Sequence, residues 1–204
     1  MDNQAYLDQI TASTQPTKGS GNHIIPPLAL KLLIGGVILA VLIIIFGSIL
    51  GNLNPNAEEL SKQLSYRLDN VNATIEKYNP NVQSSQLRSK GTATKTVLTD
   101  TKRKLDSFLE EKYGFKADPK SETAAIEQKH IDAVNKKLEN ARLNAYLDRI
   151  YVHELSHQVE LIMVMEADIN AHTDNNKLKE IVNNSLNSLK EIDTSIQQTA
   201  ETIK

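Results

Sequence analysis

Apolar side chains are concentrated in one uninterrupted run near the start of the chain, where residues 32–50 read LLIGGVILAVLIIIFGSIL. The run has no charged residue, and Ser48 is its only polar side chain. As a helix it would be roughly 28 Å long, close to the ~30 Å hydrocarbon core of a bilayer. Helices of soluble proteins seldom extend this far without a polar face. The pattern therefore predicts a transmembrane helix over residues 26–51.

The flanks of this segment favour an uncleaved signal anchor. A cleaved signal peptide has an apolar core of about 7–15 residues and a small-residue cleavage site, and this run is longer and has no A-x-A pattern after it. Lys31 precedes the run, whereas Glu58 and Glu59 are the first charges after it. By the positive-inside rule, residues 1–25 are expected in the cytoplasm and residues 52–204 outside the cell membrane. The short head is rich in Thr, Ser, Gly and Asn, a composition that predicts disorder.

After the apolar run, large apolar residues recur every three or four positions, the period of an amphipathic helix. No stretch alternates apolar and polar residues for long enough to predict a strand. Proline and glycine supply the helix boundaries, at Asn54-Pro55, Asn79-Pro80, Gly114 and Asp118-Pro119. The expected helices cover about 55–78, 82–113, 119–172 and 176–203. The sequence therefore predicts an all-α protein, in which one transmembrane helix is followed by an elongated antiparallel bundle or coiled-coil-like domain over 52–204.

The third of these helices is expected to be long, because no Gly or Pro occurs from Lys120 to the end of the chain. It would exceed fifty residues, or about 75 Å, unless it bends. The polar stretch from His172 to Asn176 has the composition of a turn and ends it.

Two patterns would allow the chain to form homo-oligomers. Small residues lie near one face of the membrane helix, at Gly36, Ala40, Gly47 and Gly51. Small residues allow two membrane helices to approach closely, so this face favours dimerisation in the bilayer. In the last helix, apolar residues recur every seven positions, at Val182, Leu189, Ile196 and Ile203. Such heptads pack either within a bundle or in a coiled-coil dimer.

One motif has catalytic character, His153-Glu154-Leu155-Ser156-His157. Its H-E-x-x-H spacing places two imidazoles on one face of a helix, where they can bind a single zinc ion. The intervening glutamate can act as general base toward a metal-bound water. The motif resembles the signature of zincin-type zinc metallopeptidases. By that resemblance, His153 and His157 would be zinc ligands and Glu154 the catalytic base.

Other features of that family are missing from the sequence. The G-x-x-H continuation of metzincins is absent, and His172 and Glu180, which could supply a third ligand, lie in no recognisable second motif. Zincins also contain a sheet, and no strand is predicted here. On a helical wheel, His153 and His157 face away from the buried stripe of their helix. The alternatives are a surface metal site that includes Glu160, or two solvated histidines.

A related pattern, E-x-x-H, occurs at Glu127–His130 and at Glu154–His157. Ferritin-like di-iron bundles use two such pairs from different helices, together with two further glutamates. Here both pairs fall within the predicted helix 119–172, about 40 Å apart. They could meet only if that helix broke near Asn140.

Composition and charge narrow the chemistry further. The chain has no cysteine, which excludes disulfides and thiolate metal sites, and its formal net charge is −2. The basic segment 88–104 carries six Lys or Arg and one Asp, without interleaved aromatic residues. It is interpreted as a solvated helix face, with an anionic polymer or lipid headgroups as the alternative partner. We expect no nucleic-acid partner.

Together these patterns favour a single-pass membrane protein with a structural or protein-interaction role at the cell surface, as a scaffold, adaptor or accessory subunit. Its partners would be membrane lipid and an unidentified protein, and no cofactor is expected. The alternative hypothesis is a membrane-tethered zinc-dependent hydrolase that uses His153, Glu154 and His157.

Overall fold

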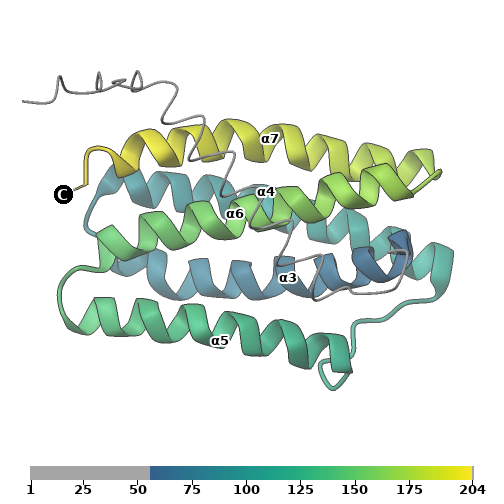
Figure 1. Ribbon diagram of the computed structural model, residues 1–204, viewed down its shortest axis with the longest axis horizontal. Coiled ribbons are helices and arrows are strands. Elements are labelled where there is room, and N and C mark those ends of the chain that lie inside the picture. Colours follow the sequence, from purple (N-terminus) through teal and green to yellow (C-terminus); the bar gives the residue numbers. More distant parts are fainter. Residues whose placement is uncertain (1–55, 204) are drawn as a thin grey trace, which may run out of the picture. The chain divides into compact units, whose positions relative to one another are not determined.

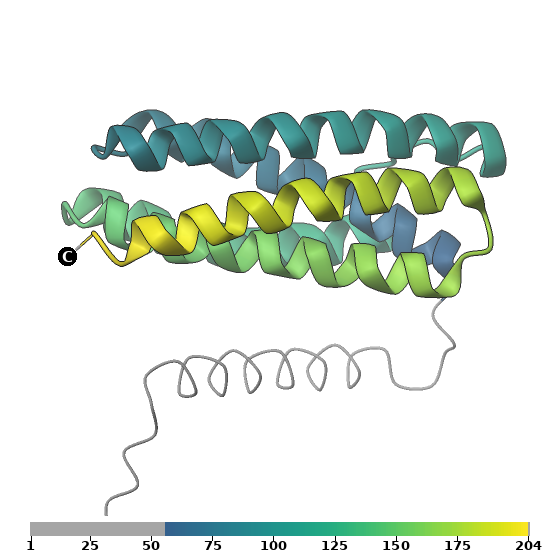
Figure 2. The same cartoon turned by 90° about the horizontal axis from the view of Figure 1, so that it is seen from above.

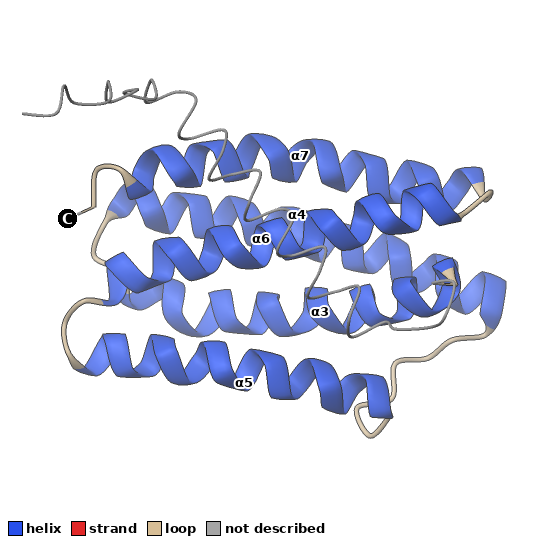
Figure 3. Cartoon of the chain, viewed as in Figure 1, coloured by secondary structure: helices blue, strands red, loops and turns tan. Residues whose placement is uncertain are grey.

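The computed structural model describes residues 56–203, in which helices are joined by short loops and no strand occurs (Figures 1 and 3). The α-helices are α3 (Ala57–Tyr78), α4 (Ser85–Tyr113), α5 (Glu122–Leu143), α6 (Leu147–His172) and α7 (Asn176–Ala200), with the short 3₁₀ helix η1 (Asn79–Asn81) after α3. The prediction of an all-helical bundle is therefore confirmed for this part of the chain.

The predicted membrane helix, 26–51, and its small residues Gly36, Ala40, Gly47 and Gly51 lie outside the described residues. Within 56–203, no helix combines the length and the apolar character needed to cross a bilayer.

The five helices run alternately in opposite directions (Figure 1). α3 packs against α4 and α6, and α7 packs against α4 and α6, so these four helices form a closed ring of neighbours (Figure 2). α5 packs against α3 and α6 from outside that ring. The loops 79–84 and 144–146 lie at one end of the bundle, with the last described residues. The loops 114–121 and 173–175 lie at the other end, where α3 begins (Figure 1).

The core consists of the apolar stripes that the helical periodicity identifies. On α3 these residues are Leu60, Leu64, Leu68, Val71, Ile75 and Tyr78, all of them buried. The heptad residues Val182, Leu189 and Ile196 of α7 are also fully buried, and Ile203 packs partly against the same core. The heptad stripe is thus used within the chain, so a coiled-coil dimer through it would require α7 to leave the bundle.

The segment predicted as one helix over 119–172 is two helices, and this prediction was wrong. α5 ends at Leu143, and Ala145 adopts a left-handed conformation with φ 61°. The Tyr146 N–H donates to the Ala141 carbonyl at 3.1 Å, and the Ala145 N–H to that of Arg142 at 3.4 Å, as in a Schellman C-cap. Glycine usually occupies the left-handed position of this motif, so an alanine there carries no clear sequence signal.

The remaining helix ends differ slightly from the proline-based boundaries. Side-chain caps are supplied by Asn56, Ser84, Ser121 and Asn175, each of which accepts a hydrogen bond from a backbone N–H of the first turn. α5 therefore begins three residues after Pro119. Gly114 ends α4 with φ 64°, as predicted from its position.

Candidate functional site

The H-E-x-x-H motif lies on α6, on the side that faces α5. His153 is exposed, whereas Glu154 and His157 are partly buried. Glu154 Oε1 forms an ion pair with Lys137 Nζ of α5 at 2.6 Å. His153 and Glu154 also border an open groove of about 180 Å³ between the end of α5 and the start of α6, together with Tyr146.

The residues considered as further metal ligands do not gather around the motif. His172 lies fifteen residues after His157 on the same helix, roughly 22 Å away, and its Nδ1 is 2.8 Å from the Asp168 carbonyl oxygen. Glu180 is exposed on the first turns of α7. The carboxylate of Glu160 lies within 3.4 Å of Gln197 Nε2 of α7. Within 56–203, no three His, Asp or Glu side chains are placed to share one metal ion.

The break between α5 and α6 brings the two E-x-x-H segments side by side. His130 Nε2 of α5 lies 3.4 Å from Gln158 Oε1 of α6, and His157 is close enough to His130 to lower its pKa electrostatically. Both carboxylates have cationic partners, because Glu127 binds Arg67 and Glu154 binds Lys137. Such neutralised carboxylates are unlike the free ligand oxygens of a di-iron site.

Around these residues, polar side chains from three helices meet in what we name the polar seam. Its members are Gln63 and Arg67 of α3, Glu127 and His130 of α5, and His157 and Gln158 of α6. The Arg67 guanidinium binds Glu127 through two N–H groups, with Nη2 at 3.0 Å from Oε1, and Gln63 Nε2 donates to the same oxygen at 2.7 Å. The Arg67 and Glu127 side chains are only 5% and 1% exposed, so this ion pair is shielded from water. A pair so shielded stabilises the fold only while both partners are present.

Two polar groups of the seam lack a hydrogen-bond partner among the described residues, Arg67 Nη1 and Gln158 Nε2. Burial lowers the pKa of His130, and the nearby Arg67 lowers it further. Burial also lowers the pKa of His157, which Lys137 and Arg67 reinforce and Glu154 opposes. Both imidazoles are therefore harder to protonate than a solvent-exposed histidine.

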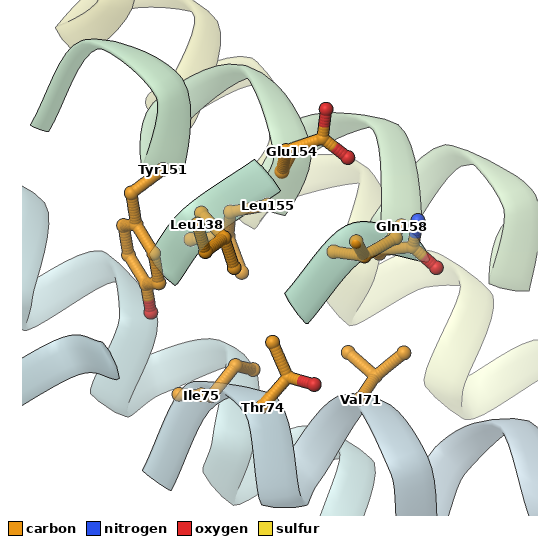
Figure 4. A pocket seen from close by; sticks show the side chains of 9 residues that line it. Val71, Thr74, Ile75, Leu138, Tyr151, Glu154, Leu155 and Gln158 are labelled. Atoms are coloured by element: carbon orange, nitrogen blue, oxygen red, sulfur yellow. The ribbon is translucent and has the colours of Figure 1, made fainter. Parts of the chain in front are cut away.

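The interior next to the motif is filled. One void of about 10 Å³ lies between α3, α5 and α6, lined by Val71, Ile75, Leu138, Tyr151 and Leu155 among others (Figure 4). This volume is close to that of a single water-sized probe, and the side chains that line it are mainly apolar. It cannot accommodate an organic substrate. A larger open groove, of about 380 Å³, lies at the end of the bundle and is lined by Gln83, Arg149 and Ile203, with the α5–α6 turn.

A second buried polar group lies between α6 and α7. Glu166 is 0% exposed, and neither of its carboxyl oxygens has a hydrogen-bond partner in the described part of the chain. Burial raises the pKa of Glu166 to about 8; the Ser185 hydroxyl of α7 lowers it by less and does not reach hydrogen-bonding geometry. This carboxyl is therefore mainly protonated at neutral pH.

Glu127, His130 and His157 of the seam were recognised from their spacing, but the burial of Arg67, its pairing with Glu127 and the burial of Glu166 were not predicted, because a helical wheel assigns charged residues to the solvent face. The one available signal was positional. Arg67 precedes Leu68 on the buried stripe of α3, and Glu166 follows Met165 on that of α6.

In comparisons with known proteins, no family model, no curated protein and no solved structure matches the chain.

Proposed function

We propose that the chain is a single-pass membrane protein whose helical bundle has a structural or protein-interaction role at the cell surface. The observation that carries the proposal is the uncharged run 32–50, which matches the thickness of a bilayer and directly precedes a compact unit, 53–204. The N-terminal head would be cytoplasmic and the bundle extracytoplasmic. Membrane lipid and a protein would be its partners.

The interior of the bundle supports a non-enzymatic role. The apolar stripes of its helices are packed against each other, and the void beside the candidate motif has a volume of only about 10 Å³. The general base that the peptidase hypothesis requires, Glu154, is already paired with Lys137. Binding through outer surfaces needs no internal cavity, and helix faces and loop clusters commonly provide such surfaces.

The end of the bundle with the α5–α6 turn is the best-supported contact surface. Leu143 and Tyr146 are 69% and 41% exposed there, beside the groove of about 380 Å³. Exposed large apolar residues next to a groove are typical of protein-interaction sites.

Cysteine mapping tests the proposed topology directly, because the chain has no cysteine of its own. Ser13→Cys places a thiol in the head, and Asn187→Cys places one at an exposed position of α7. We expect a membrane-impermeant maleimide to label Asn187→Cys in intact cells, and Ser13→Cys only after lysis. Both variants should stay in the membrane fraction after carbonate washing. Release by carbonate, or the reverse labelling pattern, would contradict the proposal.

The alternative function is a membrane-tethered zinc hydrolase, which the spacing of His153, Glu154 and His157 favours. It requires Glu154 to separate from Lys137 and a third ligand to approach. Zinc content and peptide cleavage should be measured for the purified protein and for His153→Ala and Glu154→Ala. Stoichiometric zinc that is lost in His153→Ala, with cleavage lost in both variants, would establish the hydrolase.

A further inference from the structure

The groove of about 380 Å³ at the end of the bundle has a partly apolar lining. Its apolar residues come from the α5–α6 turn and from the last described residues, and they are Ala145, Tyr146, Leu147 and Ile203. Figure 1 shows this turn and the last described residues at the same end of the bundle. Leu143, two residues before Ala145, is 69% exposed. An apolar side chain of a partner would therefore be shielded from water at this end of the bundle.

The charged residues that line the same groove leave one guanidinium without a partner. The lining contains one acid among the described residues, Asp148, and both of its carboxyl oxygens are occupied. They accept hydrogen bonds from the backbone N–H groups of Gln83 at 2.8 Å and Ser84 at 2.7 Å. Arg149 is exposed and forms no hydrogen bond or ion pair with any residue of 56–203. All the N–H donors of its guanidinium are therefore available to a ligand.

The second arginine of the groove, Arg142, is held only by an exposed ion pair. Its Nη2 lies 2.6 Å from Glu139 Oε1, and the two side chains are 42% and 38% exposed. Such a pair contributes little to stability, so a carboxylate of a partner can replace Glu139 at small cost. The lining thus offers donors from two arginines, and it has no acceptor of its own that would neutralise Arg149.

The size and chemistry of the groove fit an acidic peptide segment better than a second copy of this chain. Its volume falls at the lower end of the ~300–1,000 Å³ that is typical of ligand pockets. A guanidinium binds a carboxylate through two parallel N–H groups, which is stronger than a hydrogen bond between neutral groups. In a symmetric contact between two copies through this end, each Arg149 would instead face the cationic lining of the other copy.

We propose that the groove binds a segment of another protein in which an acidic side chain lies within a few residues of a large apolar side chain. The carboxylate binds Arg149, and Arg142 adds a second positive charge to the same groove. The apolar side chain packs against Tyr146, Leu147 and Ile203. This proposal rests on the protein-interaction role proposed above, and it adds the chemistry of the partner.

Selection from short random peptides displayed on phage tests the proposal. The target is the full-length Ser13→Cys protein in lipid nanodiscs, biotinylated at that thiol so that the whole bundle stays accessible, and empty nanodiscs remove non-specific binders. We expect the enriched peptides to combine Asp or Glu with Leu, Ile, Phe, Tyr or Trp. Selection against Arg149→Glu should instead enrich peptides with Lys or Arg, because the sign of the free charge is reversed.

Synthetic copies of the enriched peptides, amidated at the C-terminus, then measure the contribution of each side of the groove. Arg149→Gln and Tyr146→Ala should each weaken binding by about tenfold. Replacing the acid of the peptide with its amide should weaken binding to the wild type by a similar factor, and should have little further effect on Arg149→Gln. Arg103→Gln is the matched control, because Arg103 is exposed on α4 far from the groove, and it should bind as the wild type does.

The proposal is overturned by a selection with no enrichment over empty nanodiscs, by enriched peptides that lack acidic residues, or by equal binding to Arg149→Gln. Self-association of the full-length protein in detergent that Tyr146→Ala abolishes would assign the groove to a second copy, and would overturn it as well. Cysteine mapping reports the membrane topology separately, so a failure of this proposal can be distinguished from a failure of the proposed topology.

Discussion

Glu166 makes the stability of the bundle fall as the pH rises. The pKa of this carboxyl rises from its ordinary value of 4.5 to about 8 in the fold, because burial disfavours the charged form. The folded state therefore keeps the proton over a range in which the unfolded chain has lost it. The stabilisation is fully present below pH 4.5 and is lost as the pH rises through about 8.

The size of the effect follows from the two pKa values. Between acid and pH 7 the loss is on the order of 3 kcal/mol, and at pH 9 it is on the order of 4–5 kcal/mol. Glu166→Gln replaces the carboxyl with a neutral group of the same shape and removes the titration. We therefore expect the free energy of unfolding of the variant to equal that of the wild type at pH 4. At pH 7 and pH 9 it should exceed the wild-type value by about these amounts.

Urea unfolding of residues 53–204, followed by circular dichroism at 222 nm from pH 4 to pH 9, measures this difference. Glu191→Gln is the matched control, because Glu191 is exposed on α7 and its substitution should leave the pH dependence of the wild type intact. A wild-type stability that is level between pH 5 and 9, or a Glu166→Gln variant that declines as steeply as the wild type, would refute the reasoning.

Three further substitutions test the packing, each by the free energy of unfolding. A Cβ at Gly91 would lie 2.6 Å from the Tyr151 hydroxyl, so Gly91→Ala should destabilise by about 1–3 kcal/mol in spite of the better helix propensity of alanine; a more stable variant would contradict this. Arg67→Met should cost about 3–5 kcal/mol by leaving Glu127 buried and unpaired, whereas Arg67→Met/Glu127→Leu should recover most of that loss. Ala145→Gly should stabilise by up to ~1 kcal/mol, because φ is 61° there, and a destabilised variant would show that the turn is not strained.

The parts of the fold that local chemistry determines could be read from the sequence. The three- and four-residue spacing of Leu60, Leu64 and Leu68 identifies the buried face of α3, and all three are buried. Gly114 ends α4 because glycine adopts the left-handed conformation readily. These features depend on neighbours within one turn, so a single sequence contains them.

The features that depend on tertiary contacts could not be predicted. The turn at Ala145 uses a residue with no preference for positive φ, and the hydrogen bond between Asn144 and Asn140 forms only once the turn is made. Arg67 is buried because Glu127, sixty residues later, meets it across the bundle. For the candidate motif, the wheel placed both His153 and His157 toward water; His153 is exposed, but His157 is partly buried. The pairing of Glu154 with a lysine of another helix had no local signal.

The odd number of helices in 56–203 has a mechanical consequence. Since each of the five helices reverses the direction of the one before it, the chain enters the bundle at one end and leaves it at the other (Figure 1). Tension applied between these two points acts along the helix axes. Interlocked side chains on neighbouring helices must then slide past each other together, whereas the strands of a hairpin pulled from one end can separate one contact at a time. A bundle of this connectivity is suited to transmit a pulling force over its full length.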